Sequence, residues 1–107
     1  MNIAASINFD EPIHDSVQVN YFGACRVLEL AHEMKKVEVL THVSTAYAMA
    51  WMPHKSFIPE ELRPWSTDHE LFLKKVLAMN PQEAAENIRS LVNPFINTYA
   101  LTKSMAE

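Results

Sequence analysis

Glycine is almost absent from this sequence: Gly23 is the one glycine among 107 residues. Globular domains average roughly 7% glycine, because tight turns and close backbone contacts require it. A glycine-rich phosphate-binding loop, which needs several glycines close together, therefore has no place in these residues. We expect the chain to be an internal segment of a larger protein, taken from between its glycine-bearing loops.

Other scarcities exclude further classes of function. Cys25 is the one cysteine, so no intramolecular disulfide can form, and its apolar helical surroundings predict a small buried thiol. The net charge is −4 and no run of Lys or Arg occurs, so the signature of a nucleic-acid-binding protein is missing. No stretch approaches the ~20 apolar residues of a membrane-spanning helix, and no signal peptide is recognisable. The five histidines show no ligand spacing on a shared element, so we predict no metal site.

The first half of the chain has a strand–helix–strand pattern. Residues 1–5 have the composition of the end of a strand, and residues 37–44 are short and rich in β-branched side chains, as in a buried strand. Between them, apolar or small residues recur with helical spacing over residues 13–36. A βαβ unit of this kind predicts an α/β fold with a parallel sheet.

The second half is predicted to begin with a packed surface loop and to continue as helices. Residues 46–67 are too rich in proline for regular structure and too aromatic for a free linker. A helix capped by Thr67 and Asp68 is expected to run to Met79, a second from Pro81 to Val92, and a third from about Thr98. The loop's prolines and aromatic residues are Pro53, Pro59, Pro64, Trp51, Phe57 and Trp65.

Two groups of residues are candidates for chemistry. Ser44 and Thr45 follow the predicted strand 37–44, and ligands bind at the carboxyl ends of parallel strands. A hydroxyl there can stabilise a substrate carbonyl oxygen as it gains negative charge, although such residues also merely satisfy backbone groups at a strand end. Tyr99 and Lys103 lie four apart on one helical face, where an ammonium favours phenolate and suits the tyrosine to acid–base catalysis. Alone, this spacing also fits a surface pair.

Five segments together resemble the fatty acyl-CoA reductase family, in its order and at about its spacing. They are Ile-Ala-Ala-Ser-Ile-Asn-Phe-Asp-Glu-Pro at 3–12, Val-Asn-Tyr-Phe-Gly at 19–23 with Leu-Glu-Leu-Ala at 28–31, His-Val-Ser-Thr-Ala-Tyr at 42–47, and Asn-Thr-Tyr-Ala-Leu-Thr-Lys-Ser-Met-Ala-Glu at 97–107. The resemblance implies that residues 1–107 are the central part of a Rossmann-type reductase domain. This would be a partial, doubly wound parallel α/β sheet without its phosphate-loop half and its C-terminal substrate region.

The resemblance also implies roles for individual residues. Tyr99 would be the proton donor, and Lys103 would assist it while holding the nicotinamide ribose. Thr45 matches the hydroxyl that binds the substrate carbonyl, with Ser44 the second candidate for that role.

Three further residues match positions near the cofactor. Ala4 and Ala5 match a turn that runs beside it, and Asn20 matches a helix asparagine near it. Ala24 departs from the threonine that is usual in the related Asn-x-x-Gly-Thr motif, which puts local helix contacts in doubt. In the loop, Met49, Met52, Trp51 and Trp65 are candidates to line an acyl path or simply to pack the loop down.

By this resemblance, the parent enzyme would use NADPH to reduce a long-chain acyl-CoA to a primary alcohol. The segment alone would be inactive, because the phosphate loop is missing from it. The alternatives are a thioester reductase acting on carrier-bound acyl groups, and a truncated product without catalysis. The family also suggests the cytosolic face of the peroxisomal or endoplasmic reticulum membrane, with any membrane association outside these residues.

Overall fold

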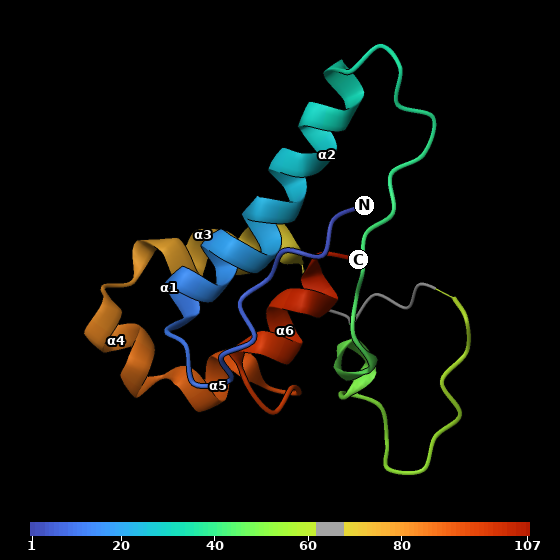
Figure 1. Ribbon diagram of the computed structural model, residues 1–107. Coiled ribbons are helices and arrows are strands. Elements are labelled where there is room, and N and C mark those ends of the chain that lie inside the picture. Colours follow the sequence, from blue (N-terminus) through green and yellow to red (C-terminus); the bar gives the residue numbers. More distant parts are fainter. Residues whose placement is uncertain (62–67) are drawn as a thin grey trace.

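A computed structural model describes residues 1–61 and 68–107, and this part of the chain is dominated by helices (Figure 1). Pro64, Trp65 and Thr67, which the sequence assigns to the loop and to a helix cap, lie outside the described residues. The elements in chain order are α1 (Ile13–Ser16), the π-helix η1 (Val17–Phe22), α2 (Gly23–Glu33), the 3-10 helix η2 (Ala46–Met49), α3 (His69–Ala78), α4 (Pro81–Glu86), α5 (Ile88–Val92) and α6 (Thr98–Met105).

The predicted long helix is confirmed as one continuous helical run formed by α1, η1 and α2. The run ends at Glu33 rather than Lys36, because Met34 already has extended backbone with ψ of 121°. Its first half is buried through Ile13, Ser16 and Val17, whereas α2 has no buried residue and projects away from the body (Figure 1). Cys25 in α2 is accordingly half-buried, more exposed than predicted.

The strand predicted over residues 37–44 does not form a ladder. Within residues 1–61 and 68–107, strand pairing is limited to one parallel bridge between Asn2 and His42. Two backbone hydrogen bonds make it, from Asn2 N to Thr41 O at 2.7 Å and from Val43 N to Asn2 O at 2.9 Å. A strand of a parallel sheet is buried by the elements that cover the sheet. Val39 is exposed here, so this segment lacks the cover that such a strand has. The parallel direction agrees with a βαβ unit, and the doubly wound sheet stays a prediction.

Side-chain caps define the helices of the second half. Asp68 accepts from Leu71 N–H at the start of α3, Asn80 from Glu83 N–H at the start of α4, and Asn97 from Ala100 N–H at the start of α6. The expected helices at 69–79 and from Thr98 are therefore confirmed.

The helix predicted over 81–92 is interrupted. It breaks at Asn87, whose side-chain amide donates to Glu83 O at 2.8 Å and competes with the backbone ladder.

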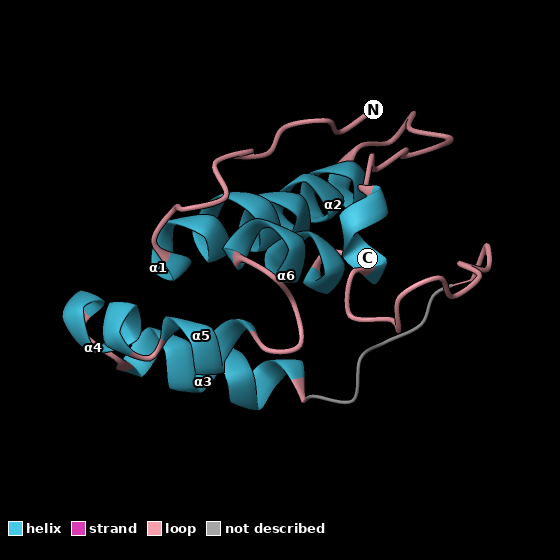
Figure 2. Cartoon of the chain, turned by 90° about the horizontal axis from the view of Figure 1, so that it is seen from below, coloured by secondary structure: helices cyan, strands magenta, loops and turns pink. Residues whose placement is uncertain are grey.

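The core lies between two layers of helices. Figure 2 shows α1, α2 and α6 in one layer and α3, α4 and α5 in the other. Leu101 of α6 is fully buried at the centre, beside Ile13 and Val17 from the first layer and Val76 from the second. Because α6 is enclosed on most sides, six of its eight residues are buried, polar ones included.

Within its described residues, the loop predicted over residues 46–67 is packed only near its start. Ala48 is buried, and Trp51 packs against the core. Phe57 is 85% exposed and Ile58 is also exposed, so the prediction of a packed loop is wrong for this stretch. No helix in the described ranges is both long enough and apolar enough to cross a membrane.

Candidate functional site

Lys103 is the buried centre of the candidate site. Its residue is 3% exposed, and its Nζ donates to the backbone oxygen of Val43 at 2.8 Å. The same nitrogen lies 3.4 Å from Nε2 of His42. The carbonyl that it holds belongs to the residue directly before Ser44. The α6 lysine and the Ser44–Thr45 pair, far apart in sequence, therefore lie close together.

Tyr99 lies one turn before Lys103 on α6 and faces aromatic neighbours. Its ring centroid is 5.2 Å from that of Phe9 and 6.5 Å from that of Tyr47, and Phe9 and Tyr47 contact each other at 6.0 Å. Such edge-on and tilted contacts fix the plane of an aromatic ring. The tyrosine side chain is thereby oriented by the N-terminal segment and by η2 together.

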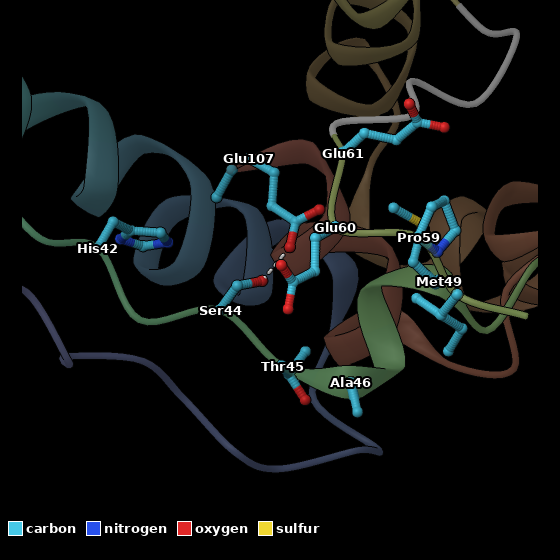
Figure 3. A pocket seen from close by; sticks show the side chains of 11 residues that line it. His42, Ser44, Thr45, Ala46, Met49, Pro59, Glu60, Glu61 and Glu107 are labelled. Atoms are coloured by element: carbon cyan, nitrogen blue, oxygen red, sulfur yellow. Dashed lines mark hydrogen bonds between the residues drawn. The ribbon is translucent and has the colours of Figure 1, made fainter.

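The two hydroxyls after Val43 have different partners. Ser44 donates from Oγ to the carboxylate of Glu107, just beyond α6 (Figure 3). Thr45 accepts at Oγ1 from Tyr47 N–H at 3.3 Å and so caps η2. The local backbone role foreseen for these residues thus holds for Thr45. That bond uses a lone pair, so the Thr45 hydroxyl proton remains able to donate to a carbonyl oxygen.

An open cavity of about 500 Å³ lies beside these hydroxyls (Figure 3). Among the residues that the structure describes, Glu60, Glu61 and Glu107 line it with carboxylates, together with the apolar Met49. Carboxylates repel phosphate groups, so the cavity suits an uncharged acyl chain or carbonyl better than a nucleotide. Met49 was a candidate for an acyl path, and it lies at this cavity.

Asn20 joins the segment after Ala5 to α6. Its residue is 2% exposed, its Oδ1 accepts from Ser6 N–H at 2.8 Å, and its Nδ2 donates to Ser6 O at 3.2 Å. The same Nδ2 donates to Thr102 Oγ1 at 3.1 Å. Ala4 is exposed and Ala5 half-buried directly before this anchored residue. The three predicted cofactor-side residues therefore share one structural unit.

Sequence reasoning missed the hydroxyl network behind Asn20. Thr102 donates to Thr98 O at 2.8 Å, and Ser16 Oγ lies 2.9 Å from Thr102 Oγ1. The Thr102 oxygen can accept from Ser16 and Asn20 at once, which satisfies both of its lone pairs. The signal was present as two i, i+4 polar pairs, Ser16 with Asn20 and Thr98 with Thr102, inside apolar helical faces.

His42 and Glu107 were also missed as neighbours of Lys103. Burial lowers the pKa of Lys103, and the carboxylate of Glu107 opposes this by favouring the ammonium. Burial also lowers the pKa of His42, the charge of Lys103 adds to this, and Glu107 opposes it. His42 could have been found because it lies two residues before Ser44, on the same side of an extended segment.

Comparisons with known proteins agree on one family. The family model described as "Male sterility protein", an NAD-binding family, matches residues 1–107. A "Probable fatty acyl-CoA reductase 5" of Arabidopsis thaliana is 34% identical over 129 residues, covering 100% of this chain and 26% of the relative. "Fatty acyl-CoA reductase 1" of Xenopus laevis and that of Homo sapiens are each 34% identical over 104 residues, covering 97% of this chain and 20% of the relative.

The chain thus spans about a quarter or a fifth of the length of these relatives. No solved structure matches it. The family match and the relatives extend over the same residues that form the site around Lys103 and Tyr99. On this basis, the chain belongs to the NAD-binding "Male sterility protein" family, together with the fatty acyl-CoA reductases.

Proposed function

We propose that these residues form the proton-transfer and carbonyl-binding part of an NADPH-dependent reductase that converts a long-chain acyl-CoA to a primary alcohol. The observation that carries this proposal is the Lys103–Val43 hydrogen bond of 2.8 Å. It joins the helix that bears Tyr99 to the segment that bears Ser44 and Thr45, so the groups needed for carbonyl reduction come from two elements in contact.

The chemistry proposed for each group follows from its surroundings. A carbonyl oxygen that gains negative charge needs a hydrogen-bond donor, and Thr45 has a hydroxyl proton available beside the cavity. Ser44 is the second candidate, and its proton is directed to Glu107. Tyr99 would deliver the proton to the resulting alkoxide, while the charge of Lys103 would favour that transfer.

The cofactor would be held by Ala4, Ala5 and Asn20 together with Tyr99 and Lys103. Ala4 is exposed and has a short side chain, so a ligand can approach its backbone closely. Lys103 also carries donors beyond the one used by Val43. When bound, NADPH would supply one hydride for the reduction of the thioester to an aldehyde, which releases CoA as the thiol, and a second NADPH would supply another for the reduction of the aldehyde to the alcohol. We further propose that the chain is the central part of a Rossmann-type, doubly wound parallel domain.

The test is turnover by the full-length enzyme that contains these residues. Tyr99→Phe keeps the ring contacts with Phe9 and Tyr47 and removes the proton, so alcohol formation should fall by at least about a hundredfold. Lys103→Met should lower turnover similarly and should also weaken NADPH binding. Tyr21→Phe is the matched control, because Tyr21 lies on η1 and packs on Phe22 rather than in the cavity.

Two results would change this proposal. Near wild-type alcohol formation by folded Tyr99→Phe would show that only the fold is shared with the reductases. Turnover of carrier-bound acyl thioesters, with none of acyl-CoA, would instead point to the thioester reductase alternative.

A further inference from the structure

His42 has two hydrogen-bonding neighbours that both offer donors. Its Nδ1 lies 3.2 Å from the amide nitrogen of Asn2, and its Nε2 lies 3.4 Å from Nζ of Lys103. A neutral imidazole has one N–H and one unprotonated nitrogen, so it can accept from only one of them. The ring must donate to the other, and that neighbour must offer a lone pair.

The Asn2 amide decides which neighbour this is. Its Oδ1 accepts from Ala4 N–H at 3.2 Å, which turns its NH₂ group toward the His42 ring. Nδ1 then accepts, the ring proton is on Nε2, and Nε2–H points at Lys103. An ammonium has no lone pair, whereas a neutral amine can accept from Nε2–H and still donate to Val43 O. The hydrogen bonds of Asn2 in the structure are therefore compatible with an uncharged Lys103, which can accept from Nε2–H.

A charged Lys103 requires the opposite arrangement. The ammonium donates to Nε2, so the ring proton moves to Nδ1 and needs an acceptor. The Asn2 amide supplies one by turning over, which presents its Oδ1 to His42. Its NH₂ group then faces Ala4 N–H, which loses its acceptor and becomes available to a ligand. When Lys103 gains a proton, the backbone N–H of Ala4 is thus released from Asn2 and can donate to a ligand.

We propose that His42 is a positioning residue that links Lys103 to Asn2 and, through Asn2, to the backbone N–H of Ala4. This inference rests on the proposed function, because Ala4 belongs to the turn expected beside the cofactor. A bound group that accepts from Ala4 N–H favours the turned-over amide and with it the charged lysine. Cofactor binding and the charge required for catalysis are then coupled through one imidazole ring.

The titratable groups around this pair come from several elements. Glu60 and Glu61 line one cavity with His42, and Tyr21 and Cys25 line another. Glu107, just past α6, acts on both His42 and Lys103 and accepts from Ser44. Tyr99 lies one turn before Lys103 on the same helix. Burial, the largest influence on His42, lowers its pKa and so favours the neutral ring on which the lone-pair argument rests.

The test is the pH profile of kcat/KM in the full-length enzyme. Activity that needs a charged Lys103 is lost as the pH rises through the pKa of that lysine. Asn2→Ala lets Nε2 accept from the ammonium, so the Lys103 pKa should rise and the alkaline limb should move up by roughly one pH unit. His42→Leu removes the acceptor and adds apolar surface, so the limb should move down. With His42→Leu present, Asn2→Ala should produce no upward shift.

Two further variants make the test independent of folding defects. His14→Leu removes another partly buried imidazole, which contacts Met79 O at 3.0 Å, and should leave the limb in place. His42→Gln keeps an oxygen that can accept from the Lys103 ammonium without any change of tautomer. This variant alone should therefore move the alkaline limb to higher pH, and adding Asn2→Ala should move it no further. An Asn2→Ala shift that is absent, or that persists without the His42 ring, would overturn the inference. Failure of the proposed function would be recognised separately, because Tyr99→Phe would then show near wild-type activity.

Discussion

Asn20→Ala is expected to detach the N-terminal segment from α6 and to destabilise the domain. Asn20 is the one side chain that bonds both the backbone of Ser6 and the hydroxyl of Thr102 in the described part of the chain. Truncation removes an acceptor from Ser6 N–H and a donor from Ser6 O and Thr102 Oγ1. Because Asn20 is 2% exposed, water cannot readily replace the lost amide on the α6 side.

The size of the effect follows from these three hydrogen bonds. Each contributes about 0.5–1.5 kcal/mol net, so their loss should cost about 2–4 kcal/mol of unfolding free energy. Asn20→Asp keeps the oxygen that accepts from Ser6 N–H, but it loses both donations and introduces a buried charge, so it should cost at least as much. Asn8→Ala is the matched control, because Asn8 is exposed and its Oδ1 accepts from the nearby Asp10 N–H; it should cost less than about 0.5 kcal/mol.

Urea-induced unfolding of the full-length protein measures these differences, through the midpoint and slope of each variant. NADPH affinity, determined on the same samples, shows whether the cofactor side is also affected. A stability of Asn20→Ala within about 0.5 kcal/mol of wild type would refute the reasoning. If affinity then fell without loss of stability, Asn20 would act on the cofactor alone and not as the anchor of Ser6.

Three other predictions concern the chain itself and its core. Residues 1–107 alone should bind NADPH weakly or not at all, because they carry no glycine-rich loop; micromolar binding in calorimetric titration would contradict this. The isolated chain should unfold without a sharp transition, because Val39 and the apolar residues of α2 are uncovered; a cooperative calorimetric peak from a monomer would count against it. In the full-length protein, Leu101→Ala should lower the free energy of unfolding by about 2–5 kcal/mol, because Leu101 is fully buried. Leu71→Ala, at a residue that is 66% exposed, should lower it by under about 0.5 kcal/mol. Equal shifts of the urea midpoint in the two variants would disprove the placement of α6 at the core.

Local signals determined the helices of this protein. The apolar spacing over 13–36 predicted the first helical run, and Asp68 and Pro81 marked helix starts that the structure contains. Caps and helical periodicity act within one or two turns, so neighbouring residues specify them. The same locality explains why Tyr99 and Lys103 could be assigned to one helix from their spacing.

The partners of these residues were decided by the tertiary structure. The hydrogen bond of Lys103 to Val43 and the links of Asn20 to Ser6 and Thr102 connect residues on separate elements. No local pattern encodes such distant contacts. The burial that lowers the Lys103 pKa likewise appears only when α6 packs against elements distant in sequence.

The extended segment shows the same division. Residues 37–44 have the composition of a strand, but within residues 1–61 and 68–107 they pair only through the bridge of His42 with Asn2. β-branched side chains favour an extended backbone locally, whereas a ladder forms only when a second strand supplies donors and acceptors along its whole length. The sequence by itself therefore determined the helices and the candidate side chains of the site. Only the tertiary structure decided which of them touch, because contact depends on how distant elements pack.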